Sequence, residues 1–349
     1  MVLFSINTDA AYNFVSLKML QFACLFISEV VPLLLSIAVI TLIERRALGS
    51  IQRRRGPNEH GTLGMFQPIA DGLKLVLKEL FSTSNANAVL FMAAPLFTLF
   101  FTLFFWCLIP GSNRFALVEL EYVLFIFLIV GTFNVQSVLF AGWSSNSKYA
   151  FLGGIRAASQ MISYEICMGT VIASVMLMAG SFSLVDIVHN QFDVWFFFPL
   201  FPVWVLFFIT SLAETNRTPF DLVEAEAELV AGYNVEYSSV FFAVLFIAEY
   251  GNILVMSTLS TLFFFGGWLI PFCNSLDEAI YNETYNWFFC GFIFSLKTAF
   301  HVFLFVLVRA TVPRYRYDQL MNLGWKVLLP FSLSILMLQS SLMFFFYVS

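Results

Sequence analysis

The sequence predicts an all-α polytopic membrane protein with about eight transmembrane helices and one amphipathic helix at the membrane interface. Of its 349 residues, 60% are hydrophobic and only 11% are charged, and the mean hydropathy is +0.86. So few charges cannot cover a water-soluble surface, and the long apolar runs therefore need lipid as their solvent. This composition excludes a soluble enzyme fold, a nucleic-acid-binding module and a disordered chain.

Eight apolar runs reach the length of about 20 residues that a helix needs to cross a hydrocarbon core of about 30 Å. They cover residues 20–43, 89–110, 120–142, 157–180, 194–212, 239–266, 287–308 and 326–348. The gaps between them are too short for a soluble domain. We therefore expect residues 1–349 to form a single transmembrane unit.

Lysine and arginine are distributed unevenly between the two sides of this predicted bundle. Fourteen of the 17 fall on one side: Arg45, Arg46, Arg53, Arg54, Arg55, Lys74, Lys78, Lys148, Arg156, Arg217, Arg309, Arg314, Arg316 and Lys326. The opposite side has only Lys18 and Arg114. The positive-inside rule then predicts that the loops after the first, third, fifth and seventh spans face inward and that both termini face outward.

The loop at residues 44–88 is expected to contain the amphipathic helix. Apolar residues recur every three or four positions at Leu63, Phe66, Ile69, Leu73, Val76 and Leu80, and Gln67, Asp71, Lys74 and Lys78 form the opposite stripe. Such a helix buries one face in the acyl boundary of the bilayer. The basic turn at residues 53–58 is either a positive-inside anchor for this loop or a surface that receives other subunits.

The loop at residues 213–238 is acidic. It contains one cation, Arg217, and the carboxylates Glu214, Asp221, Glu224, Glu226, Glu228 and Glu236. If the stretch from Asp221 is helical, Asp221, Glu224 and Glu228 share a face. The loop is then either a solvated acidic surface or a set of carboxyl groups that share protons.

Five ionisable residues lie well inside predicted spans, namely Glu29, Glu165, Glu249, Lys297 and His301. A charge in the bilayer is costly, so such residues usually face a bundle interior and mark proton or ion paths. A protonated structural acid is the alternative for the glutamates, and a satisfied interior histidine is equally acceptable for His301. Lys297, one turn from His301, could pair with one of the glutamates.

A line of carboxyl groups can also be drawn from the acidic loop into the bilayer. It runs from Glu224, Glu226 and Glu228 through Glu214, at the end of the fifth span, to Glu165 and Glu249. We take this line as a hypothetical proton wire.

No redox cofactor is expected on this chain. The five cysteines form no Cys-x-x-Cys pair, only one histidine lies in a span, and neither a Gly-Lys-Ser/Thr phosphate loop nor a Gly-x-Gly-x-x-Gly motif is present. The sequence therefore predicts no metal site, no haem and no binding of ATP or NADH by these motifs.

Taken together, blocks of the sequence resemble membrane subunit 1 of NADH:ubiquinone oxidoreductase, respiratory complex I. The blocks are residues 44–46, 55–58, 67–74 (QPIADGLK), 142–150 (GWSSNSKYA), 163–165 (SYE), 213–222 (AETNRTPFDL), 228–237 (ELVAGYNVEY), 308–310 and 313–321 (PRYRYDQLM). They follow one another from about residue 40 to about residue 330 of a chain with eight predicted spans. Together they make the resemblance specific.

The resemblance implies a subunit at the heel of the complex, where it forms much of the ubiquinone tunnel. The family's tunnel and junction residues carry over to Arg45, Asp71, Arg217, Glu224 and Glu226, and its proton relay to Glu165, Glu214, Glu228 and Glu249. Ubiquinone would be the substrate, and NADH, FMN and iron–sulfur clusters would lie on partner subunits. The partners would be the hydrophilic redox-arm subunits, neighbouring membrane-arm subunits and lipid, without nucleic acid.

Other functions remain open from the residues alone. A stand-alone secondary proton or ion transporter would account for the buried charges, but no internal repeat or matched pair of broken spans is visible. An assembly scaffold would account for the loops and not for the buried carboxyls. The abundance of phenylalanine and the lack of a presequence favour a mitochondrial inner-membrane protein with its charged loops in the matrix over a bacterial plasma-membrane protein.

Overall fold

The computed structural model describes residues 8–81, 86–111, 120–221, 232–269 and 286–348, and all regular structure within these ranges is helical. Seven helical segments are long and apolar enough to cross a membrane: Phe26–Ile51, Ala88–Leu108, Val123–Ser144, Lys148–Ala179, Ser239–Phe264, Phe289–Thr311 and Tyr317–Phe345. Phe201–Glu214 is a shorter apolar helix. These helices confirm the predicted all-α membrane fold.

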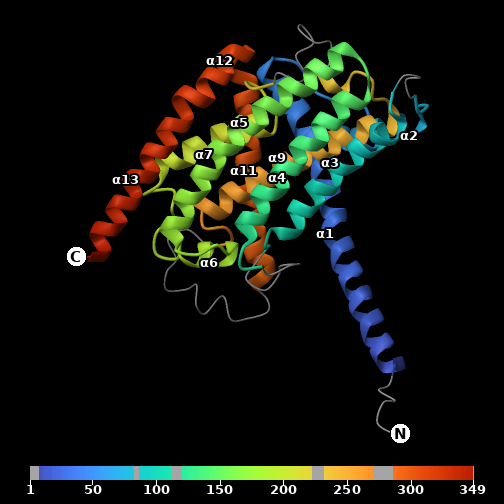
Figure 1. The fold of residues 1–349 in the computed structure, drawn as a ribbon. Coiled ribbons are helices and arrows are strands. Elements are labelled where there is room, and N and C mark those ends of the chain that lie inside the picture. The colour runs from blue at the N-terminus through green and yellow to red at the C-terminus, as the bar shows by residue number, and fades with distance from the viewer. Residues whose placement is uncertain (1–7, 82–85, 112–119, 222–231, 270–285, 349) are drawn as a thin grey trace, which may run out of the picture.

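The long helices are α1 (Thr8–Ile51), α3 (Ala88–Leu108), α4 (Val123–Ser144), α5 (Lys148–Ala179), α7 (Phe201–Glu214), α9 (Ser239–Phe264), α11 (Asn286–Thr311) and α13 (Leu329–Val348). The short ones are η1 (Thr62–Gly64), α2 (Gln67–Leu77), α6 (Leu184–His189), η2 (Gly232–Asn234) and α12 (Tyr317–Asn322), and the π-helical turn η3 (Leu323–Leu328) joins α12 to α13. Figure 1 shows α4, α5, α7 and α9 in the middle of the molecule, with α1 and α13 at opposite flanks. The N-terminal part of α1 extends away from the bundle (Figure 1).

Helices α4 and α5 approach each other closely at two glycines. A Cβ atom on Gly142 would lie 2.9 Å from the Ala150 carbonyl oxygen and 3.1 Å from the Cα of Gly154. Small residues allow such contact where two membrane helices pack. Helix α5 in turn packs against α7 and α13, and α9 packs against α3 and α11. This packing brings α1, α7, α9 and α11 around one interior region.

The fifth predicted span, 194–212, is only partly helical. Helix α7 begins at Phe201, and Pro202 lies in its first turn, where the missing N–H costs no hydrogen bond. The preceding residues form turns that are attached to the end of α9, because the Phe197 N–H donates to the Phe264 carbonyl at 2.9 Å. At 1.5 Å per residue α7 is about 21 Å long, which is less than the hydrocarbon thickness of about 30 Å.

The predicted amphipathic helix is confirmed as α2. Its apolar side chains Ile69, Leu73 and Val76 are each more than half exposed, and none of its residues is buried. The Ser239 hydroxyl, at the start of α9, donates to the carbonyls of Leu75 at 3.0 Å and Lys78 at 2.6 Å. Helix α2 is therefore attached to the bundle by its C-terminal end and keeps a largely exposed apolar face, as an interfacial helix does.

We use "the basic side" for the side of the bundle on which α1, α4, α7 and α11 end and α3, α5 and α9 begin. The loops at 44–88 and 213–238 leave the bundle there, and they contain eight of the 17 lysines and arginines. The opposite side is called the far side.

Candidate functional site

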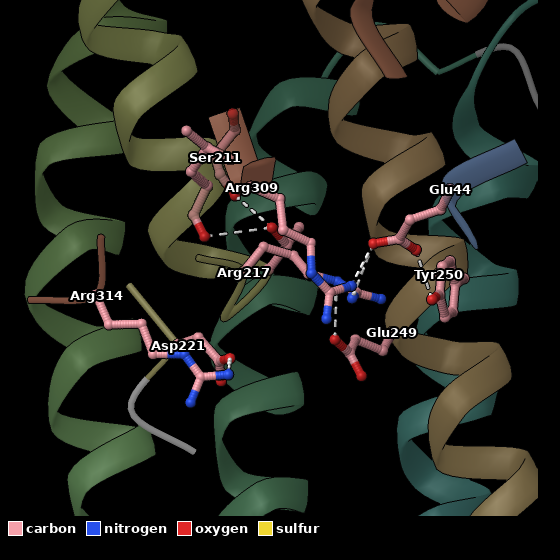
Figure 2. A network of polar contacts seen from close by, with 10 residues as sticks. Glu44, Ser211, Arg217, Asp221, Glu249, Tyr250, Arg309 and Arg314 are labelled. Carbon is pink, nitrogen blue, oxygen red and sulfur yellow. Dashed lines mark hydrogen bonds and ion pairs between the residues drawn. The ribbon is translucent and has the colours of Figure 1, made fainter. Parts of the chain in front are cut away.

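A network of charged side chains lies inside the basic side of the bundle, as Figure 2 shows. Glu44, from α1, accepts a hydrogen bond from the Tyr250 hydroxyl at 2.6 Å and forms an ion pair with Arg309 of α11. The guanidinium of Arg217 lies 3.6 Å from Glu44 and 3.0 Å from the carboxylate of Glu249. We call these five residues the charge network.

The charge network contains two carboxylates and two guanidinium groups, so its formal charges balance. The side chains of Glu44 and Arg217 are only 8% and 7% exposed. Burying either charge alone would cost several kcal/mol, whereas a set of opposite charges with good hydrogen bonds recovers much of that cost. The network is therefore stable only as a unit.

Arg217 stays protonated in this environment. Burial alone lowers the pKa of its guanidinium, but the charges of Glu249 and Glu44 raise that pKa above its ordinary value. The guanidinium also lies over the ring of Tyr250, 4.4 Å from its centroid.

A small cavity adjoins the charge network. It is lined by Ile40, Glu44, Arg217, Tyr250, Ile253, Val302, Phe305, Val306 and Arg309, and its volume of about 10 Å³ is close to what one water molecule needs. The Nη2 atom of Arg217 is buried without a hydrogen-bond partner among the described residues. The site thus offers a donor and space for a small polar group.

Local backbone structure places Arg217 at this position. Asn216 has a φ of +51°, a left-handed conformation that asparagine tolerates better than most residues, and it ends α7. The Arg217 N–H then donates to the Leu212 carbonyl at 3.1 Å. A few residues later, buried Asp221 forms an ion pair with Arg314 at 3.0 Å, which connects the start of the acidic loop to the segment after α11 (Figure 2).

Two further carboxyl groups meet near Gly131 of α4. A Cβ atom on Gly131 would lie 3.2 Å from Glu165 Oε1 and 3.8 Å from Glu214 Oε1. The other oxygen of Glu214 is buried and accepts no hydrogen bond from a described residue. The structure thus brings together Glu165 and Glu214, two of the predicted relay residues, where α4, α5 and α7 pack.

Arg45 and Asp71 also lie together, on the surface of the basic side. Their ion pair has a distance of 2.6 Å, and Gln67 donates to the second oxygen of Asp71 at 3.0 Å. Both partners are partly exposed, so this pair contributes little stability but connects α2 to the end of α1.

The possible pairing of Lys297 with a buried glutamate is not what the structure shows. The Lys297 ammonium donates to the main-chain carbonyls of Phe265 at 2.7 Å, Gly267 at 3.0 Å and Leu269 at 2.6 Å. Glu249, one of the three glutamates left open as its partner, is paired with Arg217 on the other side of the bundle. Three carbonyls at an unwound helix end satisfy the ammonium instead.

The interior position of His301 is confirmed, because its side chain is 1% exposed and its Nδ1 lies 2.9 Å from the Lys297 carbonyl. Glu224, Glu226 and Glu228, which were predicted as junction and relay residues, lie outside the described residues. Nothing about their position can enter the geometry of the site.

Sequence reasoning missed Glu44, Tyr250 and Arg309 as site residues. A signal was present for two of them, because Glu44 and Arg309 lie at the ends of predicted spans on the same side of the membrane. Opposite charges at one depth indicate pairing when no water is available to solvate them. Tyr250 had no such signal, since a tyrosine in an apolar run looks the same whether or not its hydroxyl has a charged partner.

The fold and the site define a polytopic helical membrane protein that holds balanced charges and carboxyl groups between its helices. No group of three or more His, Cys, Asp or Glu side chains that could hold a metal is found in the described parts of the chain.

Comparison with known proteins identifies the family. The profile of the NADH dehydrogenase family matches residues 24–340. NADH-ubiquinone oxidoreductase chain 1 of Chondrus crispus is 47% identical over 320 residues, which cover 92% of this chain and 96% of that protein. The Arabidopsis thaliana protein of the same name is 49% identical over 309 residues, covering 87% of this chain and 91% of that protein.

A bacterial relative has the same degree of similarity. This NADH-quinone oxidoreductase subunit, from Paramagnetospirillum magneticum, is 47% identical over 319 residues, covering 91% of this chain and 90% of that protein. The chain therefore belongs to the NADH dehydrogenase family. Membership confirms the resemblance predicted from the sequence blocks and the expectation that the chain is one subunit of an enzyme complex.

Proposed function

We propose that this chain is the quinone-site membrane subunit of a proton-pumping NADH:ubiquinone oxidoreductase. The observation that carries the proposal is the charge network, which lies inside the basic side of the bundle, close to where the acidic loop leaves it. NADH, FMN and iron–sulfur clusters would be bound by hydrophilic partner subunits docked on the basic side, and ubiquinone would enter from the bilayer near α2.

Helix α2 and the charge network have different roles in this proposal. The Arg45–Asp71 pair holds α2 against the end of α1, and the exposed apolar face of α2 borders the lipid from which a hydrophobic quinone arrives. Reduction of a quinone takes up two electrons and two protons. A balanced charge network beside the bound headgroup responds to that change because any new charge upsets its pairing.

The carboxyl groups of Glu165 and Glu214 are proposed to carry the response into the membrane. They face one space near Gly131, so a proton can pass between them with little movement. Glu249 is proposed to connect the relay to the charge network through Arg217. Glu224 and Glu226 are proposed to act at the junction with the partner subunits, and Glu228 to belong to the relay. The loops 44–88 and 213–238 are thus proposed as the two functional loops of one transmembrane unit.

Substitution of Arg217 tests the quinone part of the proposal. We expect Arg217→Gln to lower NADH:ubiquinone activity at least tenfold, while NADH oxidation by a water-soluble acceptor that bypasses the quinone site is retained. Arg217→Lys should retain part of the activity because it keeps the charge and loses the planar donor set. Glu121→Gln, at an exposed position on the far side, is the control. Equal loss of both activities would instead indicate a failure of assembly.

Native gel separation of gently solubilised membranes tests the proposed partners. The band that contains this chain should also contain flavin and iron–sulfur subunits and should oxidise NADH in the gel. Migration as a monomer or small homo-oligomer would contradict the proposal and favour a stand-alone transporter. Isolation of the active band from mitochondrial inner membranes would support the proposed location.

A further inference from the structure

Lys297 forms an unusual contact with the end of α9 on the far side. After Phe264 the chain leaves the helix through Gly266 and Gly267, with φ values of +66° and +51°. This turn directs the carbonyls of Phe265, Gly267 and Leu269 toward one point, and the Lys297 ammonium occupies that point at 2.6–3.0 Å from all three oxygens. Positive φ at both positions favours glycine, so the local sequence shapes this cradle.

The geometry requires a charged amine. Three carbonyl oxygens can only accept hydrogen bonds, so the nitrogen must supply three donors, which an ammonium has and a neutral amine lacks. The face of Trp195 lies 4.5 Å from the nitrogen and adds a cation–π contact. No carboxylate of the described residues forms an ion pair with Lys297. Among these residues, its positive charge is therefore stabilised by dipoles and a ring, and no negative charge balances it.

The position of this cation matters because polar groups run toward it along α9. The buried hydroxyls of Ser257, Thr258, Ser260 and Thr261 occupy the part of α9 between the charge network and the cradle. Phe265 follows Glu249 by sixteen residues, or about 24 Å of helix at 1.5 Å per residue. Lys297 therefore marks the far-side end of a stripe of buried hydroxyls that begins about two helical turns beyond Glu249.

His301 adds a proton-accepting atom close to that end. A carbonyl can only accept, so in a neutral imidazole the Nδ1 beside the Lys297 carbonyl carries the hydrogen, and Nε2 is the acceptor. This Nε2 is buried and has no partner among the described residues. The stripe thus has hydroxyl and imidazole groups of the kind that pass protons, immediately before the fixed cation.

We propose that Lys297 is an electrostatic barrier that prevents protons from crossing this subunit to the far side. A fixed, desolvated cation repels hydronium and any protonated side chain next to it, which is how positively charged groups exclude protons from other membrane pores. Protons handled by the buried carboxyls would then leave sideways into neighbouring subunits. The inference rests on the proposed role in a proton-pumping complex, but the leak itself is measured without turnover.

Passive proton conductance of the intact complex in liposomes tests the barrier. A potassium diffusion potential drives protons inward without NADH, and a trapped pH dye reports their entry. We expect Lys297→Met to raise the proton conductance at least several-fold, and Lys297→Arg to leave it unchanged because the charge remains. Ser295→Ala, an exposed position on the same helix, is the matched control and should also stay tight.

A second variant separates the charge from the hydrogen bonds of Lys297. Trp195→Glu places a carboxylate where the ring now faces the ammonium, so the lysine stays in its cradle while its charge is neutralised; it should leak like Lys297→Met. Tight membranes with either assembled variant would overturn the proposal. Failure of both to assemble, while Lys297→Arg assembles, would overturn it too, because the charge would then serve folding alone. NADH oxidation with ubiquinone, measured separately, shows whether the proposed function holds.

Discussion

Single buried charges in this protein are stabilised by different kinds of partner. Glu44 has two guanidinium groups and a phenol, whereas Lys297, within the described ranges, has main-chain carbonyls and a tryptophan ring. Both arrangements satisfy the rule that a charge away from water must be paired or fully hydrogen-bonded. They differ in what removal of the charge leaves behind. Loss of the Glu44 charge leaves buried arginine charges without their carboxylate, whereas loss of the Lys297 charge leaves neutral carbonyl groups without a donor.

Substitution of Glu44 should destabilise the complex more than substitution of its neutral partner. Glu44→Gln leaves the guanidinium of Arg309 without its carboxylate, and breaking a buried pair from one side costs about 3–5 kcal/mol. Tyr250→Phe removes one hydrogen bond to a charged group, worth about 1.5–3 kcal/mol. The midpoint of thermal unfolding of the purified complex should therefore fall further for the first variant.

The exposed Glu121→Gln serves as the control and should leave that midpoint unchanged. An equal fall for Glu44→Gln and Tyr250→Phe would mean that the carboxylate does not hold the arginines, and would contradict the assignment of Glu44 as the centre of the charge network.

At the residue scale, the sequence predicted Glu165 from its place inside an apolar run and Glu214 from its place at the end of one, whereas Arg45 and Asp71 came from the family resemblance. The structure brings these four residues together in two pairs. The partner of a charge was harder to predict. A glutamate was a possible partner for Lys297, but its carbonyl cradle depends on a turn that two glycines shape after another helix, and linear spacing does not contain that information.

Helix α5 contains one glycine that is in close contact with another segment of the backbone and one that faces open space. A Cβ atom on Gly153 would lie 2.7 Å from the Cα of Gly232 and 2.9 Å from the Tyr233 nitrogen, whereas nothing lies within 4 Å of a Cβ on Gly169. Backbone atoms at that distance cannot move aside as a flexible side chain can. Gly153 therefore positions η2, which lies near the end of the acidic loop.

Replacing these two glycines by alanine should have opposite effects. Gly153→Ala is expected to cost about 1–3 kcal/mol through overpacking and to displace the end of the acidic loop, with a loss of quinone reductase activity. Gly169→Ala should be neutral or stabilise α5 by about 0.5–1 kcal/mol. The midpoint of thermal unfolding and the NADH:ubiquinone activity of the two complexes are the measurements. The same loss in both variants would contradict the close contact at Gly153 as the cause.

Helix α2 provides a test of the membrane interface. Leu73 is on its exposed apolar face and Lys74 on the polar one. Leu73→Asp should reduce labelling of residues 67–77 by a photoreactive probe dissolved in the lipid, because a carboxylate is expelled from the acyl boundary. Lys74→Gln should not reduce that labelling. Unchanged labelling of both variants would place the apolar face against a partner subunit instead of lipid.

At the element scale, apolar length predicted the helices well and their boundaries less well. Helix α9 matches the predicted span to within two residues, since no charge or proline interrupts either end. Helices α1 and α5 run beyond their predicted spans because charged residues at their ends remain helical. The span at 194–212 lost its first turns because Pro199 and Pro202 delay the helix and Gln191 holds the preceding turn against α9.

For the whole molecule, the number of crossings determines which side each loop faces. We expect the seven long segments and the shorter α7 to give an even number of crossings, with both termini on one side and the two charged loops on the other. The lysine and arginine asymmetry then selects which side is inward. The number of crossings and the distribution of lysine and arginine are independent arguments for the topology, and one labelling experiment can test both.

Cysteine labelling in sealed vesicles of known orientation is the direct measurement. With the five native cysteines replaced by serine, Lys148→Cys, between α4 and α5, should react with a membrane-impermeant maleimide only from the inner side. Asp193→Cys, between α6 and α7, should react only from the outer side. Reaction of both from the same side would mean that α5, the long helix between the two positions, does not complete its crossing.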